Sequence, residues 1–281
     1  MKAADQNPAL TTTREREIVS LAEALAARVP KAPIDLEGIA ASEKIRFCFA
    51  SFPQKFDGLL THDGGEFVLI CNERRHARNS PRGRFTIAHE LGHYFIPSHR
   101  AALMAGGVAA RIPERGPWAG RVIEQESDLF AASLLMPAPL FRRIARSASG
   151  TTLERIRYLA ESFGTSITST AYRALELDLL PAPSAVLLWD PLGAPVGRRL
   201  SWKTADLGSE YFTLATKPPP DSVTARVVSS LSWGLHQGES HIMDWFTELD
   251  GYDPNHQIQV TEEVMSLGDF GWMTVISSTT L

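Results

Sequence analysis

The chain has few of the features that would place it outside a cell or in a membrane. It contains only two cysteines in 281 residues, Cys48 and Cys71, with no CxxC spacing. Each lies in an apolar, strand-like run, so we expect buried free thiols rather than a disulfide framework or a metal site. No window approaches the roughly 18 apolar residues that a membrane span requires, and the polar N-terminus lacks the apolar core of a signal peptide. These absences predict a cytoplasmic protein.

The charge balance also lacks an excess of either sign. The sequence has 28 Lys and Arg against 32 Asp and Glu, a net charge of −4. Such a chain has no general electrostatic attraction to nucleic acid. There are no internal repeats or low-complexity tracts, and a hydrophobic content of 44% is enough to bury a core. The length favours one large domain or two modest ones.

The sequence does contain an HExxH motif, within TIAHELGHYF at residues 86–95. In a helix, side chains four positions apart lie on one face, about 5 to 6 Å apart at Cβ, so His89 and His93 can reach one metal ion. Glu90, directly after the first histidine, can act on a water molecule at that metal, as in zinc-dependent peptide hydrolysis. The alternative is a buried helix with two incidental histidines.

Local signals place this motif in a helix. Ser80 and Pro81 form a helix start, with a capping hydroxyl followed by a proline where no N–H is needed. Apolar residues from Phe85 to Phe95 then recur at helical intervals. Because Pro97 disfavours helical geometry in the residue before it, we expect the helix to end there.

A catalytic zinc site needs a third protein ligand. The run RVIEQESDLFAASLLMP, residues 121–137, predicts a second helix in which Glu124 and Asp128 share one face. Glu126 lies about 200° round the helix from Glu124, so only one of the two glutamates can point the same way as Asp128. We assign Glu124 as the third ligand and Asp128 as the acceptor of a histidine N–H, which fixes the orientation of that ring. The alternative is an acidic face exposed to solvent.

Taken together, these segments resemble the ImmA/IrrE family of bacterial and phage zinc endopeptidases. The family pattern is a phrase close to RFTLAHELGH, followed by a helix of the form E-x-x-x-(N/D)-x-x-A that ends in LLMP. The chain has RFTIAHELGH at residues 84–93 and EQESDLFAASLLMP at residues 124–137. The resemblance covers roughly residues 35–180 and is much weaker in the last hundred residues.

The resemblance implies an α+β fold of the zincin-like peptidase type, with the active-site helix packed on a small, mostly antiparallel sheet beside a helical layer. It implies zinc held by His89, His93 and Glu124, with Glu90 as the catalytic base; manganese or another divalent ion is compatible with the same donors. Family members cut transcriptional repressors, so the implied partner is a protein substrate of that kind. Two alternatives stay open: a metal-dependent amidase acting on a non-peptide substrate, and a non-catalytic regulator that binds a repressor or DNA.

Strand candidates precede the motif helix at residues 45–49, 56–61 and 67–72, after helices predicted at 13–29 and 36–41. We take the last strand, Phe67 to Asn72, as the edge on which an extended substrate pairs. The connection from His99 to Gly120 is rich in Ala and Gly and is interpreted as a mobile rim of the substrate cleft. His99 itself is assigned to the surface or to the substrate side.

Residues 153–177 have the pattern of a helix-turn-helix, with Gly164 at the bend. Two uses of this segment stay open: contact with DNA, or packing in the helical layer of the peptidase domain. The acidic net charge favours packing. Tyr172 and Arg173 lie in this segment and are candidates for supporting the oxyanion or contacting the substrate.

Prolines at positions 181 and 183 mark a linker between a peptidase domain, residues 1–180, and a smaller α/β domain, residues 181–281. The second domain has strand-like runs at 185–189, 196–202, 257–264 and 272–277, and a helix that starts near Asp221. Five of the six tryptophans fall in this half, which favours an aromatic core over a ligand-binding site. Its role is open among substrate docking, sensing and dimerisation.

Overall fold

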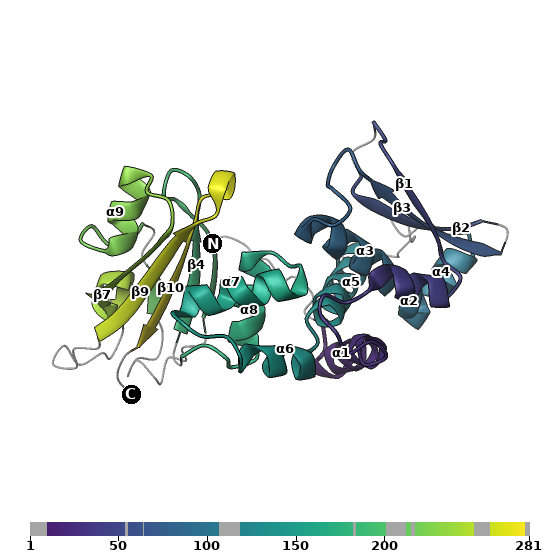
Figure 1. Cartoon of the computed structure of the whole chain (residues 1–281), viewed down its shortest axis with the longest axis horizontal. Helices are drawn as coiled ribbons and strands as arrows, with labels where there is room; N and C mark the ends of the chain where they lie inside the picture. The colour runs from purple at the N-terminus through teal and green to yellow at the C-terminus, as the bar shows by residue number, and fades with distance from the viewer. Residues whose placement is uncertain are drawn as a thin grey trace. The chain divides into compact units, whose positions relative to one another are not determined.

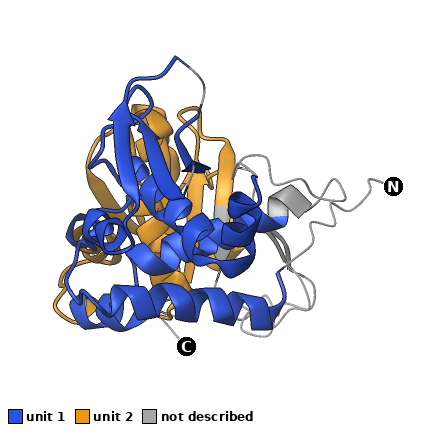
Figure 2. Ribbon diagram, turned by 90° about the vertical axis from the view of Figure 1, so that its right-hand side faces the viewer, with its two compact units in different colours: residues 1–144, 160–166 blue, residues 145–159, 167–281 orange. Residues whose placement is uncertain are grey.

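The computed structural model describes residues 10–53, 56–63, 65–106, 119–181, 184–200, 212–214, 217–249 and 259–278. The chain forms two compact units (Figure 2): residues 1–144 with 160–166, and residues 145–159 with 167–281. The helical segment between residues 145 and 167 is therefore divided between the units. A domain boundary after residue 180 stays a prediction. Within the described ranges, no helix combines the length and apolar character needed to cross a bilayer.

The first unit combines a three-stranded sheet with a group of helices (Figure 1). Its strands are β1 (Arg46–Ala50), β2 (Gly58–Asp63) and β3 (Glu66–Asn72). Its helices are α1 (Thr12–Ala26), α2 (Leu36–Ser42), α3 (Pro81–Phe95), α4 (Pro97–Met104), α5 (Ala119–Leu135) and most of α6 (Ala138–Ala145). Helix α3 contacts β2 and β3 as well as α5, and α1 contacts α5. This arrangement confirms the expected α+β class.

Strand β3 lies in the middle of the sheet, because the strand order is β1-β3-β2. It pairs with β1 in parallel and with β2 in antiparallel orientation. The expectation that Phe67 to Asn72 offers a free edge to a substrate is therefore wrong, since neighbouring strands occupy both sides of β3. The edge strands are β1 and β2. Cys48 of β1 and Cys71 of β3 are both free thiols, as expected, but only Cys71 is buried, because Cys48 lies on an edge strand and is partly exposed.

Helix α3 begins and ends where its sequence predicts. The Ser80 side chain accepts the N–H of Gly83, and Pro81 occupies the first turn. Ile96 has φ −73° and ψ 115°, an extended conformation that the following proline favours. Pro97 then starts a second helix, α4. The segment expected to form a mobile rim is therefore helical at residues 99–104, and residues 107–118 lie outside the described residues. Its place at the rim of a substrate cleft stays a prediction.

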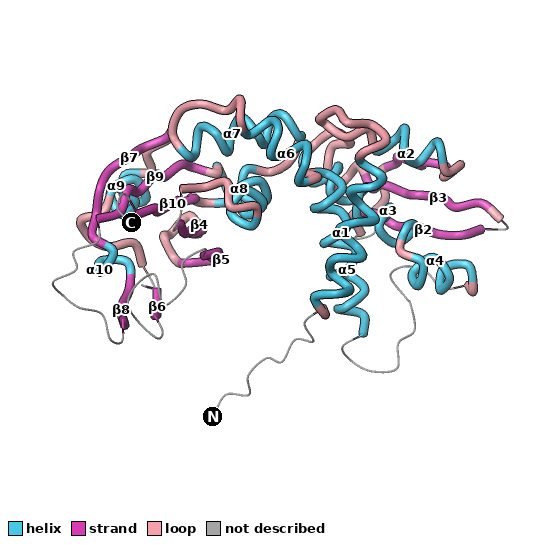
Figure 3. The backbone as a smooth tube through the Cα atoms, turned by 90° about the horizontal axis from the view of Figure 1, so that it is seen from below, coloured by secondary structure: helices cyan, strands magenta, loops and turns pink. Residues whose placement is uncertain are grey.

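The second unit is built on a five-stranded antiparallel sheet in the order β5-β4-β10-β9-β7. These strands are β4 (Ser184–Trp189), β5 (Pro195–Leu200), β7 (Leu235–His241), β9 (Gln259–Ser266) and β10 (Trp272–Ser278), and β6 (Phe212–Leu214) pairs separately with β8 (Phe246–Leu249). The helices are the first part of α7 (Thr152–Phe163), α8 (Ile167–Glu176), α9 (Val223–Ser230), α10 (Ile242–Trp245) and the 3-10 turn η3 (Gly268–Phe270). Figure 3 shows α9 beside β7 and β9.

Successive residues of these strands pack on opposite faces of the sheet. Leu187 of β4 belongs to a core cluster with α9 and α10, whereas the neighbouring Val186 packs with α7 and α8. Trp189 and Trp245 are buried in the first cluster with ring centroids 6.3 Å apart, so these tryptophans form part of a core. Gly164, at the bend between α7 and α8, has a φ of +63°, the left-handed conformation that favours glycine.

Candidate metal centre

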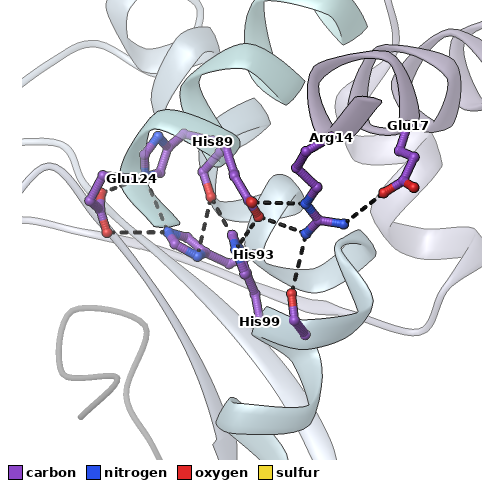
Figure 4. A network of polar contacts seen from close by, with 9 residues as sticks. Arg14, Glu17, His89, His93, His99 and Glu124 are labelled. Atoms are coloured by element: carbon purple, nitrogen blue, oxygen red, sulfur yellow. Dashed lines mark hydrogen bonds and ion pairs between the residues drawn. The ribbon is translucent and has the colours of Figure 1, made fainter. Parts of the chain in front are cut away.

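The three residues expected to bind metal lie together. His89 and His93 of α3 present their Nε2 atoms 3.2 Å apart. The Glu124 carboxylate of α5 lies 3.1 Å from Nε2 of His89 and 3.7 Å from Nε2 of His93 (Figure 4). One ligand atom from each of the three falls within 4.8 Å of the others. The fold therefore brings together the side chains that the motif spacing selects.

These separations fit a tetrahedral zinc site. With bonds of about 2.0 to 2.1 Å, the ligand atoms of a tetrahedron are about 3.3 to 3.4 Å apart. The 3.2 Å between the two imidazole nitrogens and the 3.1 Å from Oε2 of Glu124 to His89 are close to that value, whereas the 3.7 Å to His93 belongs to the other carboxylate oxygen, Oε1. Two imidazole nitrogens and one carboxylate are also a ligand set of catalytic zinc sites, which keep a fourth position for water or substrate. The side chain of Glu124 is 51% exposed, so the cluster is accessible from solvent.

Close packing of α3 and α5 makes these distances possible. A Cβ atom at Gly92 would lie 3.2 Å from Cδ1 of Phe130 and 3.2 Å from Cα of Ser127. Because interiors are densely packed, glycine at this position lets the two helices approach closely without a shift of these neighbours.

His89 is held between two carboxylates. Its Nδ1 atom lies 2.9 Å from Oδ1 of Asp128, and its Nε2 atom faces Glu124. The first contact is the one that Asp128 needs in order to accept the N–H of a histidine ligand. Burial lowers the pKa of His89, but the hydrogen bonds with Asp128 and Glu124 outweigh burial and raise that pKa to about 10. In the metal-free protein this ring is therefore protonated on the nitrogen facing Glu124, and a metal would displace that proton.

His93 has a different environment. Burial, together with the neighbouring His89, lowers the pKa of His93 to about 3, so this ring is neutral. Its Nδ1 atom lies 3.2 Å from Oγ of Ser127, a fully buried residue of α5. Ser127 could not be predicted from the sequence, because a serine next to an acidic residue carries no signal for metal chemistry.

Glu90 is buried beneath strand β2. Its Oε2 atom accepts the N–H of Leu60 at 2.8 Å. A Cβ atom at Gly58 of the same strand would lie 2.5 Å from Cγ2 of Thr86 and 3.1 Å from Cγ of Glu90, so glycine allows this close approach. Burial raises the pKa of Glu90 to about 7, against the lowering effects of His89 and the Leu60 N–H. A carboxyl group with a pKa near 7 can take up and return a proton at neutral pH.

Glu126 points away from the metal cluster and binds two other residues. Its carboxylate accepts hydrogen bonds from Arg14 of α1 at 2.8 and 2.7 Å and lies 2.9 Å from Nε2 of His99. Burial raises the pKa of Glu126, but Arg14 outweighs burial and holds that pKa below its usual value. Burial also lowers the pKa of His99, so the ring is neutral.

The assignment of His99 to the surface or substrate side is wrong, because the residue is only 1% exposed. The reason lies in Pro97, which starts helix α4 as well as ending α3. Because proline is favoured in the first turn of a helix, Pro97 also indicates a helix that contains His99. The pairing of His99 with Glu126 connects residues 27 positions apart, and no local pattern indicates it.

Tyr172 and Arg173 lie in helix α8 of the second unit. The phenol oxygen of Tyr172 lies near Gly197 of β5. Arg173 is buried and forms an ion pair of 3.0 Å with Glu176. Their contact with an oxyanion or a substrate stays a prediction.

Comparisons with known proteins address the fold and the segment that carries the site. Residues 40–175, which include α3 and α5, match a peptidase family model described as IrrE N-terminal-like domain. Among solved structures, the chain is similar to a Mycobacterium tuberculosis transcriptional regulator, with a TM-score of 0.54 and 14% identity over 94% of this chain and 77% of that chain. At this identity the likeness shows the fold alone. No curated protein matches the chain significantly.

Proposed function

Because residues 40–175 belong to the family of IrrE N-terminal-like domains, we propose that the chain is a zinc-dependent endopeptidase that cuts a transcriptional regulator in the cytoplasm. The observation that carries this proposal is the meeting of His89, His93 and Glu124 in one cluster, with Glu90 between the histidines in sequence. A ligand set alone fits many metalloproteins. A buried carboxylate next to a ligand is the additional group that hydrolysis needs.

Each of these residues has a distinct part in the chemistry. His89, His93 and Glu124 would hold zinc, which supplies Lewis acidity toward a carbonyl oxygen and toward water. Glu90 would take the proton of the attacking water as the new C–O bond forms. It would return that proton to the amine nitrogen as the peptide C–N bond breaks. The hydrogen bond from Leu60 holds the Glu90 carboxylate in one orientation.

One likeness supports a transcriptional regulator as the substrate. The motifs at residues 84–93 and 124–137 resemble those of ImmA/IrrE endopeptidases, which cut transcriptional repressors.

A second candidate function is that of a non-catalytic regulator, which the description of that solved structure favours. In this case the chain would bind a partner protein without cutting it, and the metal cluster would be structural. Glu90 argues for catalysis instead. Burying a carboxyl group costs free energy, and binding alone does not require one beside the ligands.

The test is to co-express the chain with the regulators encoded beside it and to follow their length by mass spectrometry. We expect one regulator to be shortened by the wild type and by Glu73→Gln, an exposed control in the same unit. We expect Glu90→Gln to bind zinc normally and to cut at least about 100-fold more slowly. Cleavage by Glu90→Gln at the wild-type rate contradicts the hydrolytic proposal. A regulator that binds the chain but stays intact supports the second candidate.

A further inference from the structure

Each of the two histidines in the metal cluster uses its second ring nitrogen to contact helix α5. Nδ1 of His89 lies 2.9 Å from Asp128, whose side chain is 57% exposed. Nδ1 of His93 lies 3.2 Å from Oγ of Ser127, which is 0% exposed. One ring is therefore supported by a carboxylate at the surface and the other by a hydroxyl inside the core.

From Ser127, polar contacts continue through the interior to helix α1. Figure 4 labels His93, His99 and Arg14 along this path. The longest link is 3.5 Å, between Oγ of Ser127 and Nδ1 of His99. Nε2 of His99 then lies 2.9 Å from Oε2 of Glu126. Arg14 donates to both oxygens of Glu126, from Nε at 2.8 Å and from Nη2 at 2.7 Å. Ser127, His99 and Glu126 are all buried.

The chemistry of these groups allows one direction of donation through the chain. A carboxylate paired with Arg14 only accepts, so Nε2 of His99 donates to Glu126. In a neutral imidazole, Nδ1 of His99 is then an acceptor, and the Ser127 hydroxyl donates to it. The oxygen of Ser127 is left to accept the Nδ1–H of His93. Nε2 of His93 consequently carries a lone pair and no hydrogen.

We propose that Ser127, His99, Glu126 and Arg14 are positioning residues that hold His93 as its Nδ1–H tautomer and so keep Nε2 free to bind the metal. The inference rests on the proposed metal site and extends it to residues that touch neither metal nor substrate. Arg14 belongs to α1, which precedes the matched segment 40–175, so the N-terminal helix contributes to the support of the site.

Two serines of α5 form a matched pair for the test. Both Ser127 and Ser133 are 0% exposed, but among the described residues Oγ of Ser133 has no hydrogen-bond partner, whereas Ser127 contacts His93. We expect Ser127→Ala in the full chain to bind zinc at least about tenfold more weakly, because removing such a partner typically costs 10- to 100-fold in metal affinity. Ser133→Ala should bind like the wild type in a chelator-competition titration. Equal zinc affinities of the two variants overturn the proposal.

Variants of His99 separate positioning from packing. The side-chain oxygen of asparagine lies close to the position of Nδ1, so His99→Asn keeps an acceptor for Ser127, whereas His99→Phe fills similar space without one. In nitrogen-15 spectra of the metal-free full chain, we expect the Nδ1–H tautomer of His93 in the wild type and in His99→Asn. We expect a shift toward the Nε2–H tautomer in His99→Phe, with zinc affinity in the same order. An Nε2–H tautomer in the wild type overturns the proposal, even if His99→Phe fails to fold.

These readouts need no cleavage, so the two proposals can fail separately. If Ser127→Ala weakens zinc binding while the wild type cuts no regulator, the positioning role holds and the peptidase function fails. If the wild type cuts a regulator while Ser127→Ala and Ser133→Ala bind zinc equally, the peptidase function holds and the positioning role fails.

Discussion

At the scale of single residues, the rotation of helix α5 about its axis decides which glutamate faces the two histidines. Glu124 and Asp128, four positions apart, both face His89. Glu126 faces the opposite way and pairs with His99. The helical repeat could predict that Glu124 and Asp128 share a face that Glu126 does not, but not which of the two faces meets the histidines.

Substitutions at these positions should separate ligands from supporting residues. We expect His93→Ala and Glu124→Ala to lose bound zinc, because two remaining ligands bind the ion poorly. Glu126→Ala should still bind one zinc ion, about tenfold more weakly, because it acts only through His99. Elemental analysis after dialysis against a weak chelator measures the difference. Release of zinc by Glu126→Ala and its retention by Glu124→Ala would mean that the third ligand is wrongly assigned.

Asp57, outside the metal cluster, predicts a pH dependence of stability. Burial raises the pKa of Asp57, but hydrogen bonds from Arg82, Arg75 and His76 outweigh burial and hold that pKa below its usual value. A carboxylate with a lower pKa in the folded state stabilises the fold above its unfolded pKa of about 3.9. That stabilisation is lost as the pH falls through the folded pKa.

We therefore expect Asp57→Asn to lower the free energy of unfolding at pH 7 by about 1 kcal/mol, a modest figure because the side chain is 29% exposed. The difference from the wild type should shrink as the pH is lowered below about 4. Urea denaturation at pH 7 and pH 3 measures it, with Asp63→Asn at the exposed end of β2 as the control. A difference that is the same at both pH values contradicts this account.

At the scale of elements, the edge strand next to Glu90 is β2 and not β3. The N–H of Leu60 donates to Glu90 and not to β3. Because N–H groups two residues apart in a strand point the same way, the N–H of His62 also faces away from β3. We expect an extended substrate to pair along this edge of β2.

Substitution of His62 tests the edge directly. His62→Pro removes the outward N–H but leaves the bonds to β3, so kcat/KM should fall about tenfold with little change in Tm. The His62 ring lies 4.7 Å from that of Phe67, between centroids, so His62→Ala is the control that loses the ring and keeps the N–H. If both variants cut a regulator at the same rate, the substrate does not pair along β2.

Two adjacent glutamates of β9 hold helices on opposite faces of the sheet in the second unit. Glu262 accepts the N–H groups of the first two residues of α9. Glu263 accepts those of the first two residues of α7. Both are buried, and a carboxylate at a helix N-terminus satisfies backbone donors that have no partner within the helix.

Replacing either carboxylate with an amide should destabilise the fold, because the amide offers one acceptor where two donors are buried. We expect Glu262→Gln and Glu263→Gln each to lower the free energy of unfolding by about 1.5 to 3 kcal/mol. Glu239→Gln, exposed on the neighbouring β7, should change it by less than about 0.5 kcal/mol. Denaturant unfolding compares the three, and equal stabilities would refute the capping role.

The elements that could be predicted are those whose signals are local. Helix α3 has a capping serine and prolines at its ends, and the first two residues of the HExxH motif sit in its middle turns. Strand β7, with the sequence LHQGESH, has no strand pattern of its own and exists through its pairing with β9. The central position of β3 in its sheet could not be predicted from the sequence either, because strand order depends on contacts between distant segments.

At the scale of the whole molecule, the site depends on pairings that no local pattern indicates. Arg14 and Glu126 are 112 positions apart, yet their ion pair connects α1 to the helix that carries Glu124. In the second unit, Leu153 of α7 and Ala171 of α8 are both 0% exposed and pack on the sheet, so this helix pair has a packing role, although in the second unit and not in the helical layer of the peptidase domain. Spacing could predict that His89, His93 and Glu124 come together, but only the assembled chain reveals which side chains support them.

Anomalous X-ray diffraction at the zinc edge, from crystals of the full chain grown with zinc, shows where the ion binds. We expect one strong peak about 2.0 to 2.2 Å from the Nε2 atoms of His89 and His93 and from the Glu124 carboxylate. A peak beside Glu126 and His99, or no peak near the two α3 histidines, would contradict this expectation.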